Sequence, residues 1–306
     1  MNDTRRIAHG GVHARPRTPV LYGARKVVAA APSAGGAFPN FVNNGGPVVD
    51  TPIVYTSFWG SLWQSDAAHQ SEADRLNQFC TDLLKSNFMN VLSQYGVGTG
   101  AGTGGFNGTS TIGDVSNQLT NADIEGVIQN AIDDGTIPEP PAGNTSQLLI
   151  VFFDENIEIN DPSQQLVLCE PNGDTAFGYH DFFTTSAGNP FFYAIIPGLD
   201  DACIQESCPG GDATCSLQLS ETQEQRRTQV TSHEFAEMTS DPQLNAWYDP
   251  QNGENGDICN GESEQITVNG NTWTVQRIYS KSDDVRTNGA TYCLAQAASP
   301  IPPLSS

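Results

Sequence analysis

Strand-like and helix-like sequence patterns alternate through residues 52–239. The strand-like segments are apolar and β-branched, whereas the helix-like segments repeat apolar residues every three or four positions. In chain order they are a strand at 52–58, helices at 71–86, 88–95 and 121–133, strands at 148–153, 165–169 and 191–196, and a helix at 221–239. This order predicts a single α/β (or α+β) domain in which helices flank a mixed β-sheet.

Local signals mark turns and element ends elsewhere in the chain. Thr120 precedes helix 121–133 as a plausible N-cap, because its hydroxyl can accept a hydrogen bond from the first turn. Asn269-Gly270 lies between the strand-like segments 265–268 and 272–279, which predicts a β-hairpin with a tight turn.

Two segments are expected to form long loops. Residues 96–113 contain eight glycines together with Ser and Thr, and we expect a flexible surface loop there. Residues 198–218 are rich in Cys, Gly and Asp, and we expect a disulfide-bearing loop.

The last helix, at 221–239, carries the residues most suited to chemistry. It begins with a capping-box pattern at Ser220 and Gln223, and Asp241-Pro242 is expected to end it. Within it lies the segment His-Glu-Phe-Ala-Glu, residues 233–237.

Residues four apart share one face of a helix, so His233 and Glu237 can bind the same divalent cation. Glu234 would lie beside that cation and act as the general base that takes a proton from activated water. The alternative is a solvated helix that carries His and Glu without binding a metal.

A third metal ligand is expected from the acid-rich segment 249–257, which can return to the helix through a glycine-rich turn. Asp257 is the preferred candidate, followed by Glu254, and Asp241 and His180 are further alternatives.

Zinc is the expected ion, because an imidazole and carboxylates are ligands that it accepts. Calcium is the alternative, since it takes about six to eight oxygen ligands from loops of this kind. Tyr248 is expected to donate a hydrogen bond to a developing oxyanion beside the metal.

The acidic composition excludes two classes of partner. The chain has 35 Asp and Glu residues against 13 Lys and Arg residues, a net charge of −22. Nucleic-acid backbones and anionic membranes repel such a surface. No apolar run of about 18 residues is present, so we expect no membrane insertion.

The cysteines favour an oxidising compartment. Cys80 lies on the apolar face of helix 71–86 and is expected to be a buried free thiol. The other six can form three disulfides, whose pairing stays open: Cys169, Cys203, Cys208, Cys215, Cys259 and Cys293. We therefore expect an extracellular, secreted protein, although no signal peptide is recognisable.

The start of the chain differs in charge from the rest. Residues 1–30 contain six of the 13 basic residues and one acid, Asp3. We expect residues 1–45 to be a basic, disordered tail and linker, followed by one globular domain at 46–306. A pro-segment, or a contact between this tail and the acidic body, is the alternative.

Two stretches resemble known secreted proteins. Gly45-Gly46-Pro47-Val48, with Val54-Tyr55 and Phe58-Trp59-Gly60, resembles the start of the characteristic region of the EXORDIUM/phosphate-induced proteins and their microbial relatives. Residues 231–259 are similar to a segment of uncharacterised secreted microbial proteins that share this start. The resemblance implies an extracellular protein, since the plant members are apoplastic and tied to growth signalling, without established catalysis.

The element order also resembles a zincin-like domain, with a strand, a helix, three strands and then the His-Glu helix. Metzincins have a Gly and a third His where this chain has Ser240 and Gln243. The resemblance therefore implies the gluzincin-like arrangement, in which a downstream carboxylate completes the site.

Two hypotheses for function follow from these observations. The first is a secreted zinc-dependent hydrolase, most simply a metallopeptidase acting on a peptide or cell-wall-associated substrate. The second is a non-catalytic extracellular EXORDIUM-like protein in which the same acids hold a structural Ca²⁺ ion.

Overall fold

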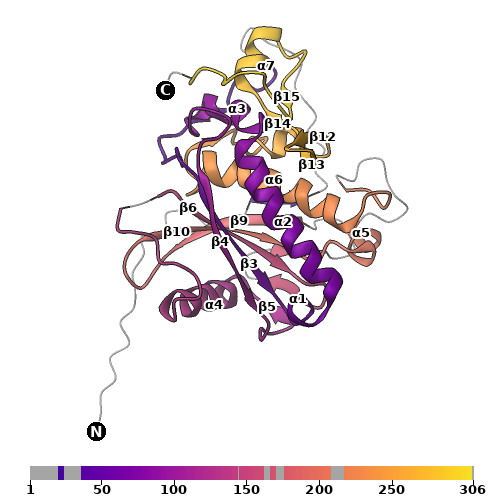
Figure 1. The fold of residues 1–306 in the computed structure, drawn as a ribbon. Helices are drawn as coiled ribbons and strands as arrows, with labels where there is room; N and C mark the ends of the chain where they lie inside the picture. Colours follow the sequence, from indigo (N-terminus) through magenta and orange to yellow (C-terminus); the bar gives the residue numbers. More distant parts are fainter. Residues whose placement is uncertain are drawn as a thin grey trace.

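A six-stranded mixed sheet forms the centre of the molecule (Figure 1). The computed structural model describes residues 20–23, 36–143, 145–161, 166–169, 176–207 and 217–304. The strands lie in the order β1 (Val20–Gly23), β9 (Ala176–Thr184), β10 (Pro190–Ile196), β6 (Gln147–Phe153), β3 (Ile53–Trp59) and β4 (Gly105–Ile112). β10, β6, β3 and β4 are parallel, and β9 runs antiparallel to both β10 and β1.

The sheet is buried on both faces. Leu148 and Ile150 of β6 belong to one apolar core, and the intervening Leu149 and Val151 belong to another. Successive side chains of a strand point to opposite faces, so a strand that packs helices on both sides has to be apolar throughout. This explains the continuous apolar run of β6.

Helices cover the two faces unequally (Figure 1). α2 (Ala67–Lys85) and α6 (Gln223–Ser240) pack on the larger core, and α4 (Asn121–Asp133) packs on the smaller one. Asp66 caps α2 by accepting the backbone N–H groups of Ala68 and His69. Thr120 caps α4 in a capping box with Asp123, as its predicted role requires.

Shorter elements connect these layers. They are α1 (Leu62–Ser65), α3 (Phe88–Leu92), η1 (Ser93–Tyr95), α5 (Asp201–Ser207), η2 (Asp257–Cys259), α7 (Lys281–Thr287), β2 (Val42–Asn43), β5 (Gln118–Leu119), β7 (Glu158–Asp161), β8 (Leu166–Val167), β11 (Trp247–Tyr248), β12 (Ser263–Val268), β13 (Asn271–Gln276), β14 (Ile278–Tyr279) and β15 (Cys293–Leu294).

The predicted mixed α/β architecture is confirmed, and so is the hairpin. β12 and β13 pair antiparallel around Asn269 and Gly270, whose φ angles are 52° and 85°. Two consecutive positive φ angles are what a tight hairpin turn requires. The hairpin is tied to α2, because Asp82 accepts hydrogen bonds from the side chains of Asn269, Asn271 and Trp273.

The prediction of a flexible loop over 96–113 was wrong for its second half. Residues 105–112 form β4, which pairs parallel with β3 at the edge of the sheet. Hydroxyl groups reinforce the pairing, since Thr56 and Ser57 bond to Thr109 and Ser110 at 2.9 Å. The high glycine content of this segment predicts a loop, but pairing with β3 stabilises it as a strand.

Two other expectations differ in detail. The loop predicted at 198–218 contains α5, although residues 208–216 lie outside the described residues. The capping box of α6 uses Thr222 and Gln225 instead of Ser220 and Gln223, so the helix begins two residues later than predicted.

The cysteine pattern is confirmed where it is described. Cys169 bonds to Cys203 and Cys259 bonds to Cys293, and Cys80 is a buried free thiol. Cys208 and Cys215 lie outside the described residues. Two disulfides indicate an oxidising compartment. No helix in the described ranges is long and apolar enough to span a bilayer.

The packed part of the chain begins before residue 46, the expected start of the domain. Phe38 and Phe41 are 1% and 0% exposed, and the carboxylate of Asp284 accepts the backbone N–H groups of Ala37 and Phe38. The remaining tail residues, 1–19 and 24–35, lie outside the described residues.

Candidate metal centre

The predicted His-Glu helix, α6, is buried along most of its length. Every residue from Arg226 to Ser240 is shielded from solvent. The helix contacts β9 and β10 of the sheet and β13 of the hairpin. Buried polar side chains need partners, so His233, Glu234 and Glu237 have to find theirs inside the protein.

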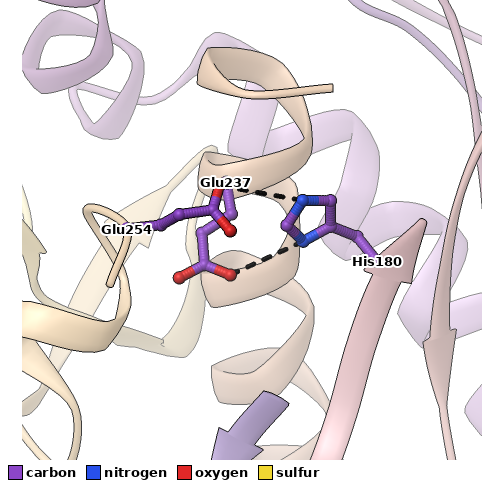
Figure 2. A group of neighbouring side chains, drawn as sticks. All are labelled: His180, Glu237 and Glu254. Carbon is purple, nitrogen blue, oxygen red and sulfur yellow. Dashed lines mark ion pairs between the residues drawn. The ribbon is translucent and has the colours of Figure 1, made fainter. Parts of the chain in front are cut away.

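His180 of β9 lies at the centre of this polar cluster. Its Nδ1 atom is 3.4 Å from Glu234 Oε2 and 3.5 Å from Glu237 Oε2, and its Nε2 atom is 3.7 Å from Glu254 Oε1. Figure 2 shows the imidazole facing Glu237 of the helix and Glu254 of the following loop. Strand, helix and loop thus converge on one point.

His180, Glu237 and Glu254 each offer one ligand atom, and these atoms lie within 4.8 Å of one another. Within the described part of the chain, neither nitrogen of His180 and neither oxygen of Glu254 has a hydrogen-bond partner, although both residues are at most 1% exposed. Two ligands of a tetrahedral zinc ion lie ~3.3 Å apart when each bond is ~2.0 Å. His180, Glu237 and Glu254 are therefore able to hold a metal ion together.

The two oxygens of Glu237 have different surroundings. Oε1 accepts the backbone N–H of Asp257 at 3.1 Å and lies 3.1 Å from His233 Nε2. Oε2 faces His180 and has no hydrogen-bond partner among the described residues. One oxygen is thus anchored by the protein and the other is left for a cation.

The loop that carries Glu254 is held close to α6 by its neighbours. Asn255 donates to Ser240 Oγ at 2.7 Å, and its backbone carbonyl accepts the N–H of Tyr279 at 2.9 Å. The Cys259–Cys293 disulfide follows directly and ties the loop to β15. These contacts position the Glu254 carboxylate against the helix.

The cluster carries more negative charge than a protein interior tolerates. Burial raises the pKa of Glu234 and raises that of Glu254 well above its usual value. Burial and the charge of Glu237 raise the pKa of Asp257 to about 8. At neutral pH, either bound protons or a divalent cation in their place must neutralise these groups.

Two members of the cluster are stabilised in their charged forms. Burial alone would lower the pKa of His180, but the three surrounding glutamates raise it well above its usual value. Burial opposes ionisation of Glu237, but the two histidines lower its pKa to about 2. Glu237 is therefore a carboxylate at neutral pH, as a metal ligand has to be.

The structure brings most of the predicted site residues together. His233, Glu237 and Asp257, the predicted set, lie close enough to hold an ion. Glu237 is shared with the second group, formed with His180 and Glu254. Glu234 touches His180 in that second group.

Two of the predicted candidates have other surroundings. Asp241 accepts the backbone N–H groups of Asn245 and Ala246 at 2.6 and 2.5 Å, which closes the turn after α6. Tyr248 lies in β11, paired with Val42 of β2, and no described contact joins its hydroxyl to the cluster. Its predicted role as an oxyanion donor stays a prediction.

Three features of the site were not found from the sequence. His180 was no more than an alternative ligand because strand β9 was missed, although Phe177, Tyr179 and Phe182 give it strand-like content. Gln276 bonds to His233 from the hairpin, and Gly256 packs against the same ring. Neither residue carries a local signal for these roles.

Gly256→Ala is expected to weaken metal binding at this site. Its backbone angles, φ −74° and ψ −45°, suit any residue, but a Cβ atom would lie 2.7 Å from His233 Nδ1 and 2.8 Å from Glu237 Oε1. Displacement of groups that orient a ligand costs about 10–100-fold in metal affinity. Isothermal titration with zinc measures the loss.

Gly126→Ala is the matched control for this substitution. Gly126 lies within α4, where an added Cβ atom meets nothing within 4 Å. Alanine there should stabilise the helix by about 0.5–1 kcal/mol and leave zinc affinity unchanged. Equal zinc affinity in the two variants would contradict the close packing of residue 256 against the site.

Comparisons with known proteins do not indicate a function for this chain. No protein-family model, no curated protein and no solved structure matches the chain.

Proposed function

We propose that this chain is an extracellular zinc-dependent hydrolase, with His180, Glu237 and Glu254 as the metal ligands. The observation that carries the proposal is the convergence of these three buried side chains, with the carboxylate of Glu234 3.4 Å from His180. Three protein ligands leave a fourth position free for water or substrate, as in catalytic zinc sites.

The donor set favours zinc over calcium. An imidazole nitrogen is a good ligand for zinc, whereas calcium is held by about six to eight oxygens. The group of His180, Glu237 and Glu254 offers one imidazole and two carboxylates, which have fewer oxygens than calcium takes.

Glu234 is the residue that would carry the acid–base step. A bound zinc ion supplies a Lewis acid that acidifies water. Glu234 is 0% exposed and its pKa is raised by burial, so its carboxylate accepts a proton more readily than an exposed glutamate would. Peptides are the proposed substrate class, and the acidic surface favours neutral or cationic ones.

Metal analysis combined with one conservative variant tests the proposal. We expect purified protein to contain one zinc per chain and to cleave members of a fluorogenic peptide library. Glu234→Gln should retain zinc and lose at least about a hundredfold in rate, which is the typical contribution of a general base. Protein that contains no zinc, or that cleaves equally well with Gln at 234, would overturn the hydrolase assignment.

The burial of the cluster favours a second candidate function. His180, Glu234 and Glu237 are each 0% exposed. A site this enclosed is suited to a structural metal in a non-catalytic extracellular protein of the EXORDIUM-like kind. Thermal unfolding after EDTA treatment, with Zn²⁺ or Ca²⁺ then added back, separates the candidates: rescue by Ca²⁺ alone, without hydrolysis, would support this second one.

The stability of the metal-free protein is expected to fall as the pH rises from 5 to 8. The pKa of Asp257 moves from 3.8 to about 8 on folding, so between these values the native state holds a proton that the unfolded chain has released. Stability decreases with pH wherever the native state binds more protons. The raised pKa of His180 acts in the same direction.

Zinc should reverse this trend, because the metal binds only deprotonated ligands. Melting temperatures measured at pH 5, 6.5 and 8, with EDTA and with zinc, give the pH dependence of stability for the metal-free and the zinc-loaded protein. Asp257→Asn should reduce this pH dependence in the metal-free protein. A metal-free protein that is more stable at pH 8 than at pH 5 would contradict the protonated cluster.

A further inference from the structure

Gln276 of β13 makes two hydrogen bonds with the same amide nitrogen. Its Nε2 atom lies 2.8 Å from the carbonyl oxygen of Gly256 and 2.8 Å from Nδ1 of His233. Gln276 is 0% exposed, and its backbone N–H donates to Ser232 Oγ at 2.9 Å. The backbone and the amide nitrogen of this residue are therefore both held in place.

The Gly256 carbonyl decides which way the amide points. A carbonyl oxygen can only accept, so the atom facing it has to be the NH₂ group of Gln276. The second proton of that NH₂ group then points to His233. Since Gln276 donates there, Nδ1 of His233 has to be the acceptor and cannot carry a proton.

The proton of a neutral His233 ring is thereby placed on Nε2, which lies 3.1 Å from Glu237 Oε1. A protonated ring nitrogen has no lone pair for a metal, but it is a good hydrogen-bond donor to a carboxylate. Glu237 Oε1 accepts the backbone N–H of Asp257 at 3.1 Å, and Nε2 of His233 lies 3.1 Å from the same oxygen without forming a hydrogen bond of good geometry.

We propose that Gln276 holds the ring proton of His233 on Nε2, so that His233 is a positioning residue packed against Glu237 and His180 is the imidazole ligand among the described residues. This inference rests on the proposed zinc site. It reverses the assignment that the helical spacing suggests, in which His233 itself binds the metal. His233 instead packs its Nε2 side against Oε1 of Glu237, which the backbone N–H of Asp257 holds, and Oε2 is left facing the ion.

X-ray absorption of the zinc-loaded protein counts the imidazole ligands directly. We expect one imidazole in the wild type and one in His233→Gln, which replaces the ring with a polar side chain beside Glu237. Zinc affinity of this variant should fall about 10–100-fold, the usual effect of losing an orienting partner. Two imidazoles in the wild type, falling to one in the variant, would overturn the inference while leaving the zinc site itself established.

A second measurement does not depend on the metal. Nitrogen NMR of the His233 ring, in metal-free protein at a pH where the ring is neutral, should show a proton on Nε2 and none on Nδ1. Gln276→Met removes the donor to Nδ1, so the proton of the neutral ring should no longer be confined to Nε2. A protonated Nδ1 in the wild type would overturn the inference, whereas failure of the protein to bind zinc would overturn the proposed function alone.

Discussion

His180→Asn is expected to abolish the thermal stabilisation that zinc gives to the wild type. The substitution removes the imidazole that faces Glu234, Glu237 and Glu254 from the opposite wall of the site. At a zinc concentration one hundred times the dissociation constant, binding should stabilise the wild type by about 2.7 kcal/mol, and the variant should gain nothing measurable. Melting curves with and without zinc measure the difference.

His69→Asn is the matched control. His69 also lies between two carboxylates, with Nδ1 2.8 Å from Asp66 and Nε2 3.0 Å from Glu155. His69 lies outside the cluster, and its side chain is 15% exposed. The His69→Asn variant should therefore keep the full thermal stabilisation by zinc. Glu254→Gln is the companion test, because it keeps the shape of the side chain while removing its charge. A zinc response that survives in both His180→Asn and Glu254→Gln would exclude this set of ligands.

Arg227→Met is expected to destabilise the fold by about 3–5 kcal/mol, because it removes one partner of a buried ion pair. Arg227 is 0% exposed on α6, and its Nη1 atom lies 2.7 Å from Glu72 of α2. Its Nη2 atom donates to the carbonyl of Phe153 at 3.1 Å, and the guanidinium lies over the ring of Trp63. Urea unfolding of the two proteins measures the loss.

Arg75→Met provides the comparison, since Arg75 makes similar contacts at the surface. It pairs with Glu224 at 2.9 Å and lies over the ring of Trp273, but its side chain is 42% exposed. Exposed ion pairs contribute about 0–1 kcal/mol, so this variant should lose at most that much. Equal losses in the two variants would show that burial of Arg227 contributes nothing beyond the contact itself.

The sequence predicts well those elements whose signals are local. Helices α2 and α4 show an apolar stripe and a cap, and the β12–β13 hairpin shows its Asn-Gly turn. In each case the residues that form the element also display its periodicity. The same locality made it possible to predict that His233 and Glu237 share a helix face.

The remaining features depend on contacts between distant segments. β4 is rich in glycine and becomes a strand because β3 pairs with it. His180 joins the site only because β9 lies antiparallel to β10, which places it against α6. No spacing within the sequence encodes that approach, so the sequence alone ranked Asp257 ahead of His180.

The proposed ligands come from three separate stretches: β9, α6 and the loop that ends at the Cys259–Cys293 disulfide. When α6 is folded but β9 and the loop are not yet in place, the candidate ligands near one another are His233 and Glu237, one turn apart on the helix. Binding of an ion by this proposed set would therefore be a late event in maturation. If the chain leaves the cell unfolded, its metal content would reflect the surroundings in which it finished folding and not the cytosol in which it was made.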